Sequence, residues 1–187
     1  MRAFCALYPD SEGLDQIFQV LRQLREHPFP IRWEKPDHIH VTLKFIADID
    51  PAVLDQAIGD VSKTVTSMDS FRFRVDTLGA FPNPAKPRVV WVGSDSTPDK
   101  IATLHGLFED ACANYGVRKE QKKFTPHFTI GRTKKNGRVE NLKNAFETIS
   151  FQPFDVVFRA VRIMESTLTS QGAIHKEYRR LTFGNSE

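Results

Sequence analysis

The segment from His38 to Phe45 alternates polar and apolar side chains, a pattern typical of a half-buried β-strand. Because side chains two residues apart on a strand point the same way, one face should pack on a core. That face carries Ile39, Val41, Leu43 and Phe45. The opposite face carries His38, His40, Thr42 and Lys44. We therefore expect a strand over residues 38–46 that presents imidazole, hydroxyl and ammonium groups, a combination that suits a phosphate.

The same pattern occurs a second time, where His127 and Thr129 are again two residues apart with one apolar residue between them. A single H-x-T sequence is most often a satisfied sheet histidine, but two copies in corresponding positions favour a shared site. Arg132 follows closely. In a regular strand its side chain would point away from His127, so a phosphate contact by Arg132 requires the strand to end or to bulge near Gly131.

The remaining periodicity indicates a two-copy internal repeat. The distance along the chain from Met1 to His40 equals that from Arg88 to His127. Each half is predicted to run strand, helix, His/Thr strand, helix, strand. The helices are expected from Ser11 to near His27, from Asp50-Pro51, from Thr97-Pro98 to Gly116, and around 139–148. The other strands are expected at 2–8, 71–76, 88–93, about 154–165 and 177–183, with a turn-rich connector at 79–87.

We accordingly predict one domain over residues 1–187, with pseudo-repeat lobes at roughly 1–80 and 88–167 and a C-terminal strand at 177–183. Two similar lobes would pack about a pseudo-two-fold axis and bring the motif strands together across a central cleft.

Composition supports a single compact domain, since 40% of the 187 residues are hydrophobic and 26% are charged. No apolar run approaches the ~20 residues needed to span a bilayer. Cys5 and Cys112 lack the spacing of metal ligands, so they are expected to be buried, reduced thiols in a cytoplasmic protein.

The net charge of +3 is unevenly distributed, because one acid, Glu120, lies among many basic residues between Arg118 and Arg138. These are Arg118, Lys119, Lys122, Lys123, Arg132, Lys134, Lys135 and Arg138. A charge run is usually a solvated loop. This one flanks the second motif on both sides, which favours an electrostatic footprint for a polyanion.

Two histidines on either side of a phosphate can divide the work of phosphodiester cleavage. One takes a proton from the attacking water and the other gives a proton to the leaving sugar oxygen, and an imidazole pKa of about 6.5 suits both roles. The threonine hydroxyls would bind phosphate oxygens. A metal site is disfavoured, because two histidines are too few ligands and no acidic cluster lies beside either motif strand.

These residues resemble a known family. His40-Val41-Thr42-Leu43 and His127-Phe128-Thr129-Ile130 resemble the paired H-x-T-x motifs of the two-histidine (2H) phosphoesterases. The branch they are most similar to is the LigT-like RNA 2′,3′-cyclic phosphodiesterases, also called 2′-5′ RNA ligases. The resemblance extends over nearly the whole chain. It includes Arg2-Ala3-Phe4, Gly79 to Pro82, Arg88 to Gly93, Phe124 to Arg132 and Met164-Glu165-Ser166.

The resemblance implies a bilobal α+β fold with an antiparallel sheet and helices in each lobe. It also implies a site that needs neither metal nor cofactor and that hydrolyses RNA 2′,3′-cyclic phosphate ends to 2′-phosphates. By the family pattern, His40 would be the proton donor and His127 the proton acceptor, with Thr42, Thr129 and Arg132 on the phosphate. The motifs are nearly symmetric, so the sequence alone does not assign the two proton-transfer roles.

Two alternatives remain open at this point. The same site can join RNA ends through a 2′-5′ linkage, with a 5′-hydroxyl in place of water, and the basic run is also compatible with a non-catalytic RNA-binding module. The expected partner is an RNA with a 2′,3′-cyclic end, a tRNA fragment for example, or a small cyclic nucleotide, bound by a monomer.

Further RNA contacts are expected from side chains around the motifs, although alternation favours a core position for Phe45. The candidates are His38, Phe45, Lys122, Lys123 and Lys134. The other histidines, His27, His105 and His175, are expected at packing or surface positions.

Overall fold

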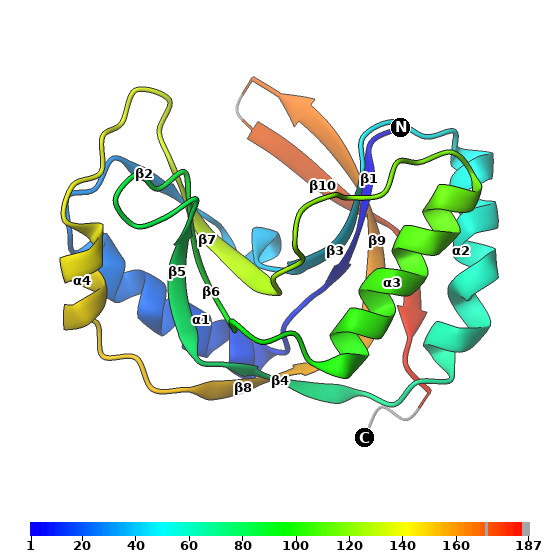
Figure 1. The fold of residues 1–187 in the computed structure, drawn as a ribbon, viewed down its shortest axis with the longest axis horizontal. Helices are drawn as coiled ribbons and strands as arrows, with labels where there is room; N and C mark the ends of the chain where they lie inside the picture. Colours follow the sequence, from blue (N-terminus) through cyan, green and yellow to red (C-terminus); the bar gives the residue numbers. More distant parts are fainter. Residues whose placement is uncertain (171, 185–187) are drawn as a thin grey trace.

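The structure is a computed structural model that describes residues 1–170 and 172–184 (Figure 1). The helical elements are α1 (Ser11–Arg25), the 3₁₀ turn η1 (Pro36–His38), α2 (Pro51–Thr66), α3 (Asp99–Asn114) and α4 (Leu142–Thr148). The strands are β1 (Ala3–Leu7), β2 (Ile31–Trp33), β3 (Val41–Ile46), β4 (Phe71–Val75), β5 (Thr77–Phe81), β6 (Val89–Gly93), β7 (His127–Thr133), β8 (Phe154–Phe158), β9 (Ala160–Thr169) and β10 (Gly172–Thr182).

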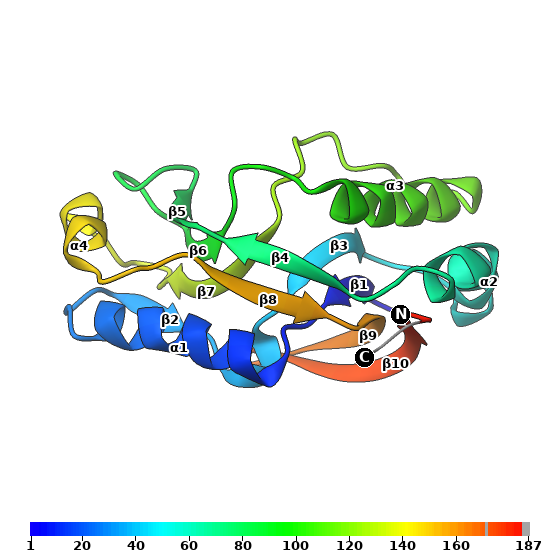
Figure 2. The same ribbon diagram turned by 90° about the horizontal axis from the view of Figure 1, so that it is seen from below.

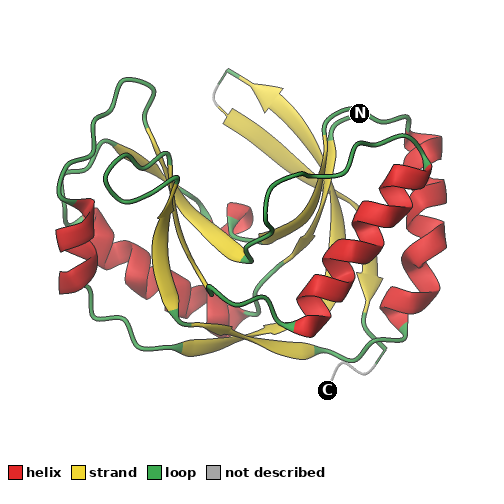
Figure 3. Cartoon of the chain, in the orientation of Figure 1, coloured by secondary structure: helices red, strands yellow, loops and turns green. Residues whose placement is uncertain are grey.

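The main sheet has eight strands and is antiparallel, in the order β10-β9-β1-β3-β7-β6-β5, with β2 also paired to β7. It forms two arms that meet where β3 pairs with β7 (Figure 1). The helices lie outside the arms, α2 and α3 beside one arm and α1 and α4 beside the other (Figure 3). A second sheet, of β4 and β8, runs across the underside of the two arms and is seen in front in Figure 2. The expected bilobal α+β fold is confirmed.

The two arms do not coincide with the two halves of the sequence. Strand β9, from the C-terminal half, pairs with β1, whereas β5, from the N-terminal half, pairs with β6. The halves expected at 1–80 and 88–167 therefore exchange a strand, and each arm contains strands from both. The equivalent strands β4 and β8 pair with each other, as a pseudo-two-fold relation between the halves requires.

Local sequence signals predict most of the helices and strands, and the observed elements differ from the expected ones mainly in where they begin and end. Asp10 rather than Ser11 caps α1, because its Oδ1 accepts a hydrogen bond from the Gly13 amide at 3.2 Å. The expected connector at 79–87 begins too early, since Gly79 lies inside β5. A glycine is required there because a Cβ would collide with the indole of Trp91 on the adjacent strand.

A β-bulge in the first motif strand corrects two sequence predictions. Cys5 pairs with Lys44 but the next residue of β1, Ala6, pairs with Thr42, so β3 holds one extra residue, Leu43. The bulge turns Lys44 into the core, where it is only 3% exposed, and turns Phe45 out, where it is 49% exposed. The strand also begins at Val41, because η1 occupies 36–38. The expected core position of Phe45 and open position of Lys44 are both wrong.

Buried Lys44 ties three parts of the chain together. Its Nζ lies 2.8 Å from Oε2 of Glu109 on α3 and donates to the carbonyl oxygen of Arg118 at 2.8 Å. The same carboxylate oxygen accepts a hydrogen bond from the amide of Glu120. The ion pair therefore fixes the start of the basic segment against β3.

We predict that Lys44→Met destabilises the protein by about 3–5 kcal/mol, because it leaves the Glu109 carboxylate buried without a counterion. Urea unfolding at pH 7 measures the change. The matched control is Lys63→Met on the exposed side of α2, which should change stability by less than about 0.5 kcal/mol. Equal effects of the two substitutions would contradict this account.

Two further expectations concern the class of protein. Cys5 and Cys112 are buried and free, as predicted. Within residues 1–170 and 172–184, the helices are all too short or too polar to traverse a bilayer.

Candidate functional site

The two motif strands contact each other directly at one residue pair, Val41 with Phe128. Both of these side chains are buried in the core. Antiparallel register therefore places the histidine of each motif opposite the threonine of the other. These four side chains lie on the opposite sheet face, which we call the open face. The structure thus brings His40, Thr42, His127 and Thr129 together, as expected, on paired strands rather than on separate walls.

A second β-bulge brings Arg132 onto the open face. On β7, Thr129 pairs with Trp91 but Gly131 pairs with Val90, so Ile130 is the extra residue. Of the two possibilities that the sequence left open near Gly131, an end of the strand or a bulge, the structure has the bulge. Arg132 Nε donates a hydrogen bond to Oε1 of Glu34 at 3.1 Å, which holds the guanidinium in place.

His127 is held in one orientation by its surroundings. Its Nδ1 lies 2.7 Å from the carbonyl oxygen of Thr125, and its ring packs on Phe81 and Trp91, with ring centroids 4.9 and 5.9 Å away. A carbonyl can only accept, so Nδ1 carries the proton and neutral His127 has its lone pair on Nε2. Burial lowers the pKa of His127, although the hydrogen bond to Thr125 opposes this shift.

His40 has a different environment. Its ring stacks on Phe4 at 4.8 Å and lies 5.2 Å from the Tyr8 ring, and its Nδ1 is buried without a hydrogen-bond partner among the residues that the structure describes. Burial lowers the pKa of His40 to about 3, and the neighbouring His175 and other basic groups act in the same direction. His40 is therefore neutral at pH 7 in the unliganded protein.

Sequence reasoning missed two residues beside His40. His175 was expected to be peripheral, but β10 brings its ring to 6.1 Å from that of His40 and 4.8 Å from that of His38. Glu34 links His38 to Arg132, because its second oxygen lies 3.4 Å from His38 Nδ1. Only the pairing of β10 with β9 and of β9 with β1 reveals His175, and no local signal in the sequence marks it.

The basic run is only partly neutralised. Lys119 and Arg138 form ion pairs with Asp110 and Glu140. The remaining lysines of the run, all exposed, are Lys122, Lys123, Lys134 and Lys135. The segment between α3 and β7 runs from the top of α3 to the centre of the molecule, where the motif strands meet (Figure 1). The positive charge of Lys122 and Lys123 therefore lies on the approach to the second motif.

His105 has a structural role, as expected. Its Nδ1 lies 2.7 Å from the carbonyl oxygen of Leu43, the extra residue of the bulge, and its ring stacks on Phe124. In the described ranges, no three His, Cys, Asp or Glu side chains converge in a way that could hold a metal ion. What the open face does offer is two imidazoles, two hydroxyls and a guanidinium, a set that can bind a phosphate and move protons around it.

Comparison with known proteins supports the repeat and the fold. The family model described as LigT like phosphoesterase matches residues 7–91 and again 92–175. The crystal structure of TT0787 from Thermus thermophilus superposes with a TM-score of 0.79 at 17% identity, covering 100% of both chains. Escherichia coli LigT complexed with 3′-AMP gives 0.77 at 18% identity, covering 98% of both.

Relatives in other organisms are more similar in sequence. The RNA 2′,3′-cyclic phosphodiesterase of Thermotoga maritima is 30% identical over 176 residues, which cover 94% of this chain and 92% of that protein. The protein of the same name from Aquifex aeolicus is 28% identical over 178 residues, which cover 94% and 93%. With both halves matched by the family model, the chain belongs to the LigT-like phosphoesterases of the 2H superfamily.

Proposed function

We propose that this protein hydrolyses RNA 2′,3′-cyclic phosphate ends to 2′-phosphate ends without a metal ion. The observation that carries the proposal is the direct pairing of the two motif strands, which gathers His40 and His127 on one face. The names of the relatives from Thermotoga maritima and Aquifex aeolicus support the choice of substrate.

In this proposal His127 is the base. Its Nε2 lone pair takes a proton from water, whose oxygen forms a bond to phosphorus. The hydrogen bond from Nδ1 to Thr125 supports this role, because it fixes the tautomer and stabilises the imidazolium that forms. This bond distinguishes His127 from His40, a distinction that the nearly symmetric motifs do not supply.

His40 is the proton donor in the same proposal. The bond from phosphorus to the 3′ oxygen breaks, and the oxygen takes the proton from His40. Although His40 is neutral in the unliganded protein, the single negative charge of a cyclic phosphodiester favours its protonated form when substrate is bound. The two histidines then exchange a proton through solvent to restore the starting state.

The phosphate-binding groups of the proposal are Thr42, Thr129 and Arg132. The hydroxyls lie on the same face as the histidines, so they can donate to the non-bridging oxygens where charge is held in the transition state. Glu34 positions Arg132, whose charge is directed at the phosphate and also disfavours protonation of both histidines before substrate binds.

The RNA strand would be bound by groups at the rim of the site. Phe45 is exposed on the open face, and the Arg2 guanidinium lies 5.1 Å from its ring centroid, an arrangement suited to stacking on a base. Lys122, Lys123 and Lys134 would contact the backbone, and His38 would act through Glu34 rather than from the motif strand. A monomer suffices, since all of these groups come from one chain. The two buried, free cysteines support a location in the reducing cytoplasm.

Product analysis on a short RNA with a 2′,3′-cyclic end tests the function. We expect a 2′-phosphate product, identified by mass spectrometry and phosphorus NMR, at a rate that EDTA leaves unchanged. A 3′-phosphate product or a strict need for divalent metal would overturn the mechanism. Ligated RNA as the main product would favour end joining, and salt-dependent binding without turnover would favour a binding module. A parallel assay with a tRNA fragment and a cyclic mononucleotide defines the substrate range.

A further inference from the structure

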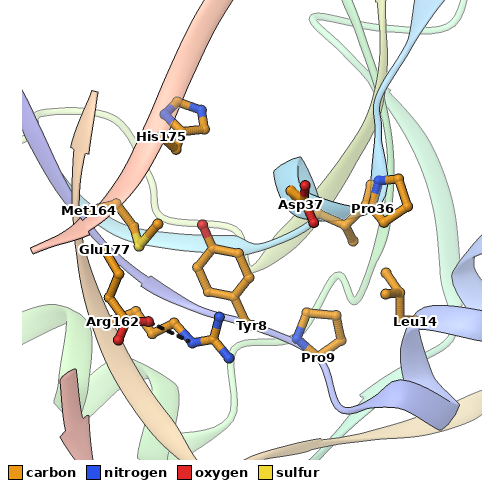
Figure 4. A pocket seen from close by; sticks show the side chains of 10 residues that line it. Tyr8, Pro9, Leu14, Pro36, Asp37, Arg162, Met164, His175 and Glu177 are labelled. Atoms are coloured by element: carbon orange, nitrogen blue, oxygen red, sulfur yellow. Dashed lines mark ion pairs between the residues drawn. The ribbon is translucent and has the colours of Figure 1, made fainter. Parts of the chain in front are cut away.

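A pocket of about 370 Å³ adjoins His40 and has no part in the steps proposed above (Figure 4). Its lining comes from the turn after β1, from α1, from η1 and the residue that follows it, and from β9 and β10. The lining residues that matter here are Tyr8, Leu14, Asp37, Ile39, Arg162 and Met164. The volume lies in the range of small-molecule sites, roughly 300–1,000 Å³.

Contacts within the protein fix the orientation of several polar groups of the pocket, and some of their hydrogen-bonding capacity remains free for a ligand. The Arg162 guanidinium lies 4.7 Å from the Tyr8 ring centroid, and its Nε is 3.5 Å from Glu177. Glu177 is in turn bound by Arg180 through two hydrogen bonds of 3.0 and 2.8 Å. The Tyr8 hydroxyl and His175 Nδ1 are buried atoms without a hydrogen-bond partner among the described residues.

The charges of the pocket favour a neutral occupant over a phosphate. Arg162 provides donors, whereas the exposed Asp37 carboxylate provides acceptors, and the two lie on different sides of Tyr8 (Figure 4). Asp37 would repel an anion. A flat, uncharged group whose edges carry both donors and acceptors suits this pair, and the apolar side chains of Leu14 and Met164 would cover its faces. A nucleobase has these properties.

The location of the pocket indicates which position of the RNA would supply the base that enters it. If His40 protonates the departing 3′ oxygen, the ribose of the terminal nucleotide lies on the His40 side of the phosphate. The Tyr8 ring is 5.2 Å from the His40 ring and forms part of the pocket lining. One ribose therefore separates the reacting phosphorus from the pocket, and Phe45, toward the other end of β1, is left for a neighbouring base.

We propose that this pocket binds the terminal nucleobase and that Asp37 makes it prefer guanine; the proposal rests on the proposed function. Guanine alone among the four bases has two adjacent N–H donors, at N1 and N2, which match the two oxygens of one carboxylate. Its O6 and N7 are acceptors suited to an arginine. Adenine, cytosine and uracil each place only one such donor on the corresponding edge.

The test uses four short RNAs that differ only in the last base, each with a 2′,3′-cyclic phosphate. We expect kcat/KM for the guanosine-ended RNA to exceed that for the adenosine-ended RNA by roughly 10-fold or more. In Asp37→Asn the ratio of the two kcat/KM values should fall toward one, because the guanosine-ended RNA loses its carboxylate contact. The matched control Asp95→Asn, at an exposed loop position, should keep the wild-type ratio.

Equal kcat/KM for all four RNAs, or a preference for guanosine that survives in Asp37→Asn, would overturn the proposal. Calorimetric binding of guanosine and adenosine 2′-monophosphates separates this failure from failure of the proposed function. If no RNA is hydrolysed yet Asp37→Asn abolishes tighter binding of the guanosine nucleotide, the pocket assignment stands and the hydrolase function is wrong. If neither nucleotide is preferred, the pocket assignment is wrong whatever the activity.

Discussion

Replacement of His40 or His127 by alanine is expected to lower kcat for cyclic phosphate hydrolysis by roughly 10²- to 10⁴-fold, the usual contribution of a proton-transfer group. In the proposed mechanism both histidines act on the same reaction, so the double variant should lose little more activity than the less active of the two single variants. Single-turnover kinetics on an RNA with a 2′,3′-cyclic end measures each loss. Circular dichroism establishes that the variants remain folded.

His27→Ala is the matched control, because His27 lies beyond the end of α1 and away from the motif strands. Its kcat should equal that of the wild type. Full activity in both His40→Ala and His127→Ala would remove the basis of the two-histidine mechanism. Loss in only one of them would leave a single essential histidine and would require a different partner for the second proton.

Acidification should destabilise the protein through His40, and His40→Leu should remove much of that sensitivity. Burial lowers the pKa of folded His40 to about 3, whereas an unfolded histidine has a pKa of about 6.5. Between these values the unfolded chain binds the extra proton and the folded chain does not, so stability falls as the pH falls. The slope from this one group approaches about 1.4 kcal/mol for each pH unit within the window.

Urea unfolding at pH 7.0, 5.5 and 4.5 measures this effect as the difference between variant and wild type, which cancels the contributions of other groups such as His127 and His175. His40→Leu should show the flatter dependence and should exceed the wild type in stability at pH 4.5. His27→Leu should follow the wild-type curve. Parallel curves for the wild type and His40→Leu would show that His40 titrates normally in the folded protein.

The sequence patterns predicted most of the helices and strands and the approach of the two motifs to each other, because both depend on local or repeated signals. The strand expected at about 154–165 is instead two strands, β8 and β9, which belong to different sheets. Asp50-Pro51 marks the start of α2, and the alternation in β4 matches its observed burial pattern. The second bulge was one of two anticipated possibilities, because Arg132 could share the face of His127 only if the strand ended or bulged near Gly131. In each case the residues themselves limit the conformations available.

The features that the sequence did not predict depend on which distant strands pair. The bulge at Leu43 exists only relative to β1, so alternation alone misplaced Lys44 and Phe45. His175 approaches His40 because β10 pairs with β9 and β9 with β1. The pocket beside Tyr8 likewise combines segments from both ends of the chain. Periodicity within a segment carries no information on these long-range registers.

The strand exchange between the sequence halves has a consequence for biosynthesis. Strand β1 leaves the ribosome long before β9, with which it pairs through contacts such as Ala3 with Glu165. Until then one edge of β1 has no native partner, and exposed strand edges promote aggregation. The arm that carries His40 can therefore be completed only after β9 has been made, whereas β5, β6 and β7 can assemble earlier. Nascent chains stalled before β9 should thus be the species that most need chaperone protection.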